Sequence, residues 1–185
     1  MKGRMRNYNV DKPMWITETA TSIPNIICNN LGWQDDVAED LIKRYARALG
    51  NDVEKVFWFA FVGLPTVEED ANGVKCNKPT NFLMGNLGWA FKNSQKYHQR
   101  LAYNAYKLMS SKLAGFTSVE KITDTQHKFI VNGKSVYVLW CDSESCSLPS
   151  EIIGTVKLTD YLGNEEIKNA NQITLGESPV FVEEK

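Results

Sequence analysis

The chain has 185 residues, of which 43% are hydrophobic and 11% aromatic, and its 21 basic and 22 acidic residues nearly balance. This composition supports a buried core, excludes a globally disordered chain, and offers no basic surface of the kind that binds nucleic acid. No apolar run approaches the roughly 20 residues that cross a bilayer, so no membrane partner is predicted. The basic N-terminus has no apolar core after it, which predicts no secretory signal and, if Met1 is the true start, a cytoplasmic location.

The first predicted element is a short strand over residues 14–19, in the stretch KPMWITETA. Three apolar residues open this strand, but Glu18 follows before the strand should end. Burying an ionised carboxylate is costly unless a partner pairs with it or a reaction uses it. We therefore expect Glu18 to have a chemical role, with a salt bridge at the rim as the alternative. The alternation of a strand predicts that Ile16 and Glu18 point to the same side.

A helix over residues 34–49 and a second strand over residues 54–62 follow. The helix has apolar residues at helical spacing, acids in its first turn, bases toward its end, and Gly50 in position to terminate it. The strand contains seven consecutive apolar residues, which is typical of a parallel strand buried on both faces. Strand, helix and strand together predict a right-handed βαβ unit. Asp35 and Asp36 are interpreted as first-turn helix charges rather than metal ligands.

A long loop over about residues 63–95 separates this unit from a second predicted helix over residues 97–113, which ends at Gly115. Loops of this length inside compact domains are usually functional or disordered. Trp33 and Trp89 lie in or next to such loops and are candidates to line a binding cleft.

From residue 116 the apolar period changes to two, which predicts an antiparallel sheet or sandwich. The stretch HKFIVNGKSVYVLWC is predicted to be a hairpin that turns at Asn132-Gly133, a pair suited to a tight turn. One of its faces is expected to pack on the two helices. The two sets of side chains on opposite faces of its second strand are Val136, Val138 and Trp140, and Tyr137 and Leu139.

The cysteines give no sign of a metal site. They lack CxxC spacing, and the chain has just two histidines to help them, so neither a metal nor another cofactor is predicted. Cys141 and Cys146 flank a short loop that a disulfide would close in an oxidising compartment. The favoured interpretation is nevertheless that all four are free thiols, at positions Cys28, Cys76, Cys141 and Cys146.

Several stretches resemble, in the same order, the C-terminal part of one enzyme family. KPMWITETA is similar to the penultimate barrel strand of the retaining glycoside hydrolases of clan A, which include many β-xylosidases, cellulases and β-mannanases. VFWFAF resembles the eighth strand, AYNAYKLMSSKL resembles the last barrel helix, and the tail with DYLGNEE and ESPVFVEE resembles the small appended β-domain. The resemblance covers the chain from about residue 12, and the order of the parts supports it more than any single motif.

This resemblance implies an α/β plus all-β fold. Residues 1–115 would form the last two βα units of a (β/α)₈ barrel, and residues 116–185 an antiparallel, sandwich-like β-domain. Glu18 would be the nucleophile, and Trp58 would form the aromatic floor of the sugar site. Retaining glycosidases need two carboxyl groups about 5–5.5 Å apart, one that attacks and one that protonates the leaving oxygen. The alternative interpretation of Trp58 is that it is a residue of the hydrophobic core and does not contact a sugar.

The chain also departs from the family pattern. The acid/base of the clan is a Glu, usually after Asn, on the fourth strand, whereas the Asn-Glu pair of this chain is Asn164-Glu165, in a predicted turn of the β-domain. The few residues before residue 12 cannot supply six strands, and Ala20 stands where Gly is common. The chain is therefore expected to be a C-terminal fragment or subunit of a retaining glycoside hydrolase that acts on a carbohydrate with a complementary barrel half or as a homo-oligomer. The alternative is a non-catalytic remnant that binds carbohydrate or serves assembly.

Overall fold

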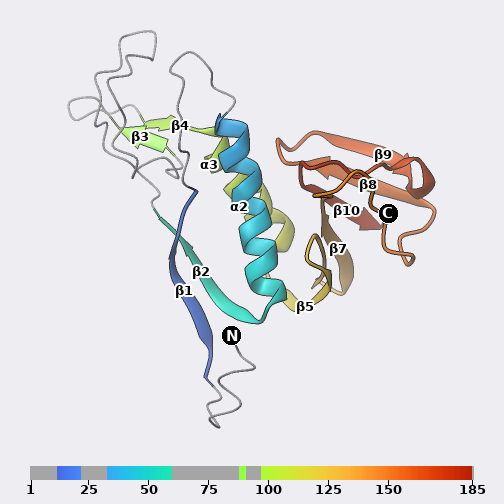
Figure 1. The fold of residues 1–185 in the computed structure, drawn as a ribbon, viewed down its shortest axis with the longest axis horizontal. Helices are drawn as coiled ribbons and strands as arrows, with labels where there is room; N and C mark the ends of the chain where they lie inside the picture. The colour runs from blue at the N-terminus through green and yellow to red at the C-terminus, as the bar shows by residue number, and fades with distance from the viewer. Residues whose placement is uncertain (1–11, 22–32, 60–87, 91–96, 185) are drawn as a thin grey trace.

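The computed structural model describes residues 12–21, 33–59, 88–90 and 97–184. They form three layers, in which a pair of helices lies between a two-stranded sheet and a six-stranded sheet (Figure 1). Within the described residues, no helix has the length and apolar character needed to span a membrane. The elements of the first part are β1 (Met14–Thr19), α2 (Trp33–Gly50), β2 (Val53–Trp58), β3 (Gly88–Ala90), β4 (Tyr97–Gln99) and α3 (Leu101–Leu113).

The N-terminal part confirms the predicted strand–helix–strand unit. Strands β1 and β2 pair in parallel, and α2 connects them in the sequence and packs on β2. Helix α2 carries Asp35 and Asp36 in its first turn and Arg47 in its last, an arrangement that favours a helix because each charge opposes the nearby end of the helix dipole. The chain turns back directly after Gly50, with Asp52 in the left-handed region at φ 62°. Two parallel strands do not by themselves form a barrel.

The second predicted helix is shorter than expected. Residues 97–99 form β4, which pairs antiparallel with β3, and α3 begins at Leu101. The helical pattern predicted over residues 97–113 is therefore wrong in its first turn. The reason is that a strand in the preceding loop offers these residues a partner, and such pairing overrides a weak local preference.

The C-terminal part is one antiparallel sheet with the strand order β5-β6-β7-β10-β8-β9. The predicted hairpin joins β6 to β7, and both turn residues, Asn132 and Gly133, have positive φ, at 51° and 77°. This confirms the tight-turn prediction. The elements are β5 (Phe116–Thr123), β6 (Gln126–Val131), β7 (Lys134–Leu139), β8 (Thr155–Asp160), β9 (Glu165–Asn169), the 3₁₀ helix η1 (Ala170–Gln172) and β10 (Val180–Glu184).

Both faces of the six-stranded sheet are covered, which confirms that the hairpin packs on the helices. One face packs on α2 and α3, and the other is covered by the segments between β7 and β8 and after β9. The described β-domain is thus a single sheet between helices and loops, and not two packed sheets. Toward the helices lie Val136, Val138 and Trp140, with Phe129 and Phe181, whereas Tyr137 and Leu139 pack with Ile152, Ala170 and Leu175.

A disulfide joins Cys141 to Cys146 at the end of β7. The favoured prediction of free thiols is therefore wrong for this pair. The intervening turn brings the two Cα atoms to 5.7 Å, within the usual span of a disulfide. Cys28 and Cys76 lie outside the described residues.

Polar contacts fix the β-domain along the whole length of α2. On the helix they are spaced by four and then eight residues, about one and two turns, which places them on one side of it. Each joins an α2 side chain to a loop at one end of the six-stranded sheet. The pairs are Asp35 with the Tyr161 hydroxyl at 2.7 Å, Glu39 with the Ser178 hydroxyl at 2.7 Å, and Arg47 with Asp142 at 2.7 Å.

A buried histidine lies where the C-terminal end of α2 meets the sheet. His127 is 0% exposed, its ring stacks on Trp140 with 5.6 Å between centroids, and neither ring nitrogen makes a well-formed hydrogen bond. A Cβ at Gly50 would lie 2.3 Å from the Nδ1 atom of His127, so a residue with a side chain does not fit there. The Arg47 guanidinium lies 4.9 Å from the centroid of the Trp140 ring. Residue 50 must therefore be glycine, because the His127 ring lies so close to its backbone. The imidazole of His127 must be neutral, because it is fully buried.

We expect Trp140→Ala to lower the free energy of unfolding by about 3–5 kcal/mol, because the ring is fully buried and the change leaves a cavity. Chemical denaturation followed by fluorescence measures this cost. Trp15→Ala is the matched control, since Trp15 is 49% exposed and its removal should cost less than about 1 kcal/mol. A cost below about 1 kcal/mol for Trp140→Ala would contradict the packing described above.

We also expect stability to fall as the pH drops from about 6.5 to about 4. Burial, aided by the positive charges of Lys121 and Arg47 and partly offset by Asp124, lowers the pKa of His127 from 6.5 to about 4. In that window the unfolded chain binds a proton that the folded chain does not, so acid favours unfolding by up to about 3 kcal/mol.

The measurement is a series of urea denaturation curves across this pH range. His127→Leu should remove this part of the pH dependence, whereas His98→Gln, a change in β4, should retain it. An unchanged pH dependence in His127→Leu would assign the effect to other groups.

Candidate functional site

Glu18 lies one residue before the end of β1, at the carboxyl end of the parallel strand pair. Ile16 pairs with Val56 and Thr19 pairs with Trp58, so β1 takes three steps where β2 takes two. The register of the pair is therefore irregular here, as it is at a β-bulge, and such an irregularity redirects the side chains within it.

The bulge changes the side of the strand to which Glu18 belongs. Ile16 and Thr19 are both half-buried, while Thr17 and Glu18, the residues between them, are both exposed. The prediction that Ile16 and Glu18 point to the same side is therefore wrong, because strict alternation fails at a bulge.

The exposed side of the strand pair carries aromatic side chains beside Glu18. Trp15 is 49%, Phe57 50% and Phe59 41% exposed, and the Lys55 ammonium lies 4.3 Å from the centroid of the Trp15 ring. We call the exposed residues Trp15, Thr17, Glu18, Lys55, Phe57 and Phe59 the open face. Phe57 and Phe59 were not singled out from the sequence. The alternation of β2 identifies them once Trp58 is known to face the helices.

Trp58 lies in the core, as the alternative interpretation of the sequence had it. Its ring is 4% exposed and stacks near Tyr45, with 6.5 Å between centroids. Burial, with the neighbouring Tyr106 hydroxyl, raises the pKa of Tyr45, as expected for an apolar environment. A ring this buried has no free face for a sugar, which argues against Trp58 as the floor of a sugar site.

Hydrogen bonds hold the carboxyl ends of β1 and β2 together. The Phe59 amide donates to the Thr19 carbonyl at 2.8 Å, which continues the pairing beyond the last residue of β2. After β1, the Thr21 hydroxyl donates to Asp40 of α2, and the same carboxylate accepts a bond of 2.6 Å from Arg44. These bonds fix the strand end that presents Glu18.

Glu18 itself makes no salt bridge and no hydrogen bond with its side chain among the described residues. The alternative interpretation, a carboxylate in a rim salt bridge, thus has no partner in the part of the chain that is described. An exposed carboxylate beside apolar rings is compatible with attack on an electrophilic carbon, provided that a second group supplies a proton.

Glu165 is unsuited to be that second group. It lies at the start of β9, where its carboxylate receives a bond of 3.0 Å from Lys112 and lies 3.3 Å from the Lys157 ammonium. The hydrogen bonds from Lys112 and Lys157 hold the pKa of Glu165 below its usual value. A general acid must be protonated before the reaction, and two lysines oppose that.

The other predicted cleft residues are described less fully. Trp33 is the first residue of α2, and Trp89 lies in β3, opposite His98 of β4. Their side chains lie outside the described part of the structure, so a shared cleft with Glu18 stays a prediction. His98 lies in a strand and not, as expected, in a helix.

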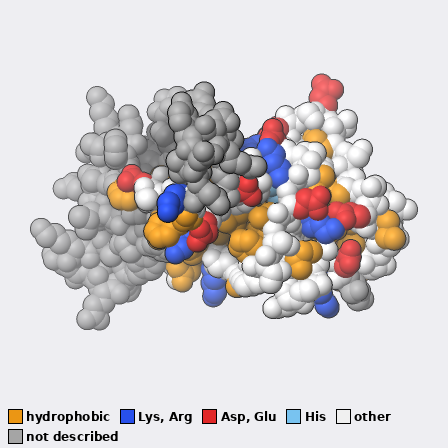
Figure 2. All heavy atoms as spheres, turned by 90° about the horizontal axis from the view of Figure 1, so that it is seen from below, with side chains coloured by type: hydrophobic (Ala, Val, Ile, Leu, Met, Phe, Trp, Pro, Cys, Tyr) orange, Lys and Arg blue, Asp and Glu red, His pale blue; other side chains and the backbone are white. Residues whose placement is uncertain are grey.

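No group of three or more acidic, histidine or cysteine side chains within the described residues is placed to hold a metal ion. Asp35 accepts a hydrogen bond from Tyr161, in keeping with its interpretation as a helix residue. On the face shown in Figure 2, acidic and basic side chains are interspersed with hydrophobic ones, and neither sign of charge dominates. Comparison with protein-family models, curated proteins and solved structures finds no match for this chain.

Proposed function

We propose that this chain is the C-terminal part of a retaining glycoside hydrolase and that Glu18 is its nucleophile. The observation that carries the proposal is the position of Glu18, which is exposed at the carboxyl end of two parallel strands and has no side-chain partner among the described residues. In barrel enzymes this is the end of the strands at which catalytic residues lie. The resemblance of KPMWITETA to a nucleophile strand supports the same role.

In this proposal Glu18 attacks the anomeric carbon of a glycoside while a second carboxyl group protonates the leaving oxygen. The second group would lie about 5–5.5 Å away and would come from polypeptide beyond these 185 residues, whether an extension of the chain or a second chain. Phe59, exposed at the carboxyl end of β2, replaces Trp58 as the aromatic residue proposed to contact the sugar.

The open face gives a physical reason to expect that further strands complete the sheet of β1 and β2. Parallel strands are normally covered on both faces, but β1 and β2 expose three large aromatic rings on the side away from α2. An isolated two-stranded pair is marginal in water, and unpaired strand edges attract further strands. We propose that additional parallel strands continue this sheet and complete the site.

The second candidate function is a non-catalytic remnant that binds carbohydrate or serves assembly. It is favoured by the engagement of Glu165 with two lysines, which makes the one Asn-Glu glutamate of the chain a poor proton donor. The coding sequence next to that of this chain distinguishes the two functions. If it encodes a barrel half with an Asn-Glu pair on a strand, this would favour the glycoside hydrolase over the non-catalytic remnant.

We expect residues 1–185 alone to form an oligomer or to bind a complementary chain, because the open face is too apolar to remain in water. Light scattering across a range of concentrations measures this. Trp15→Ser with Phe57→Ser should shift the distribution toward monomer. A compact monomer at high concentration that binds no hydrophobic dye would contradict this expectation.

We expect no glycosidase activity from the isolated chain, because loss of general acid catalysis alone costs about 10²–10⁴-fold in rate. Together with a complementary barrel half, the chain should hydrolyse glycosides with retention. An activated 2-fluoro glycoside should then label Glu18, since the covalent intermediate turns over slowly. Mass spectrometry of peptides locates the label.

Glu18→Gln should abolish both labelling and hydrolysis. Glu54→Gln is the matched control, because Glu54 is an exposed glutamate of the neighbouring strand, and this variant should keep both. A label on another residue, or full activity in Glu18→Gln, would remove Glu18 from the role of nucleophile.

A further inference from the structure

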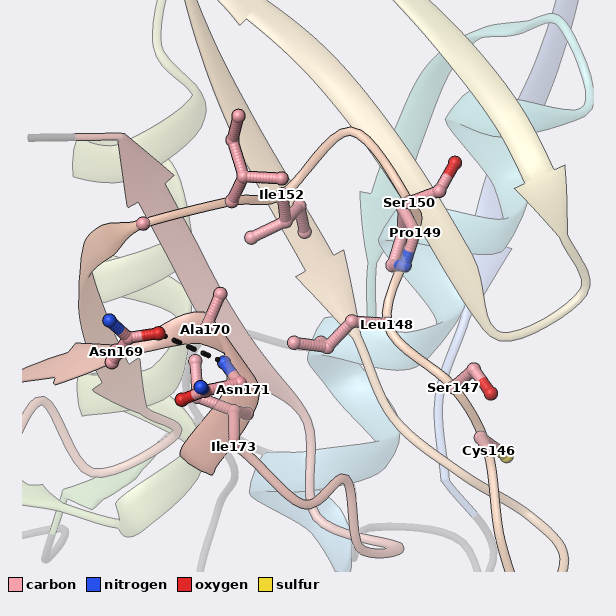
Figure 3. Close-up of a pocket in the computed structure, with 12 residues that line it drawn as sticks. Cys146, Ser147, Leu148, Pro149, Ser150, Ile152, Asn169, Ala170, Asn171 and Ile173 are labelled. Atoms are coloured by element: carbon pink, nitrogen blue, oxygen red, sulfur yellow. Dashed lines mark hydrogen bonds between the residues drawn. The ribbon is translucent and has the colours of Figure 1, made fainter.

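A wide-open pocket of about 520 Å³ lies in the β-domain (Figure 3). One wall is formed by residues of the segment 146–154, in which Glu151 pairs with Lys128 and does not line the pocket. The other wall is formed by Ala170 and Asn171 of η1 with the flanking residues Asn169 and Ile173. It opens on the face of the six-stranded sheet opposite to α2 and α3, since its residues Ile152 and Ala170 pack with that face. Its volume falls within the roughly 300–1,000 Å³ of small-molecule sites.

The lining is apolar at the base and mixed at the rim, where Ile153, 75% exposed, accompanies polar side chains, and none of the lining residues is charged. Leu148, Ile152 and Ile173 are buried or half-buried, whereas Ser147 and Asn171 are exposed around them. No lysine, arginine, aspartate or glutamate lines the cavity, although 23% of the chain is charged. A charged ligand would find no counter-charge here, so the lining favours a neutral one.

The rim has hydrogen-bonding capacity that the fold does not use. The Oδ1 atom of Asn169 accepts a bond of 3.3 Å from the Asn171 amide, the contact dashed in Figure 3. Within the described chain, the Nδ2 group of Asn169 and the whole side-chain amide of Asn171 have no partner. These donors and the acceptor are free to bind hydroxyl groups.

The walls of the cavity are held in place before any ligand binds. The Cys141–Cys146 disulfide closes the start of the first wall, and the side chain of buried Gln126 donates to the Ser147 carbonyl at 2.7 Å. The Ala170 amide donates to the Gly154 carbonyl at 2.8 Å and so joins the two walls. A site that is already ordered loses less entropy on binding.

We propose that this cavity is a binding site for a neutral sugar residue of a glycan. A pyranose has an apolar face that matches the base and a ring of hydroxyl groups that match the amides and hydroxyls of the rim. A purely apolar ligand would make no use of these exposed amides, and a phosphate or uronate would find no cation among the lining residues. The inference does not depend on Glu18. Because no aromatic ring lines the cavity, we expect a Kd on the order of 1 mM.

The test is a titration of the ¹⁵N-labelled chain with xylohexaose, cellohexaose and mannohexaose, followed by amide chemical shifts. At least one neutral oligosaccharide should shift the amides of Ser147 and Asn171 and saturate by ~20 mM. Asn171→Ala and Asn169→Asp, which keeps the Oδ acceptor of the cap, should each weaken binding about fivefold to tenfold. Asn104→Asp, the same change on an exposed residue of α3, is the matched control and should bind normally.

Four results would overturn the proposal. The first is no saturable shift with any of these sugars, the second is normal binding by Asn171→Ala and Asn169→Asp, and the third is equal binding of hexagalacturonate, which is charged. The fourth is a set of shifts confined to the residues around Glu18, which would favour the proposed function, so the two proposals can fail separately.

Discussion

Helix α2 is buried between two sheets, and its packing links the strand pair to the β-domain. Successive residues of an α-helix are rotated by about 100°, so the buried side chains of α2 span about half of its circumference. A helix that packs on one partner needs an apolar stripe of only about 100°. The buried side chains of α2 contact β2, α3 and the helix-facing side of the six-stranded sheet. These residues are Val37, Ala38, Leu41, Ile42, Tyr45 and Ala46.

The two sheets that pack on α2 differ in whether their far faces are covered. Toward the β-domain, the helix meets a six-stranded sheet that is covered on both faces, and ion pairs and hydrogen bonds fix it at both ends. Toward β1 and β2, it meets a pair of strands whose outer face carries exposed aromatic rings. The β-domain therefore acts as the anchor for α2, and α2 positions the strand pair that presents Glu18.

The sequence predicted most reliably what depends on local pattern. The bounds of β1, the long helix α2 and the turn at Asn132-Gly133 follow from periodicity and from residues with distinct backbone preferences. The packing of the hairpin on the helices also follows, because a strand with two apolar faces must be covered on both.

What the sequence did not predict depends on contacts between distant residues. A bulge at Glu18 reflects the pairing of β1 with β2, and no local signal in KPMWITETA marks it. Trp58 and Phe59 are neighbours of similar character, so only the position of α2 decides which of them is buried. The cavity beside η1 combines the segment after β7 with the segment after β9, and neither has a distinctive motif.

We infer that the β-domain and α2 form a complete structure, while β1 and β2 are part of a sheet that further strands complete. Hydrogen exchange of the folded chain distinguishes the two parts, because it measures the stability of each strand separately. We expect the amides of β7 and β10 to exchange with the slowest rates and those of β1 and β2 to exchange at least about 100-fold faster. A complementary barrel half should then slow exchange in β1 and β2. Equal protection of β1, β2 and β7 in the chain alone would show that the strand pair is already complete and would refute this inference.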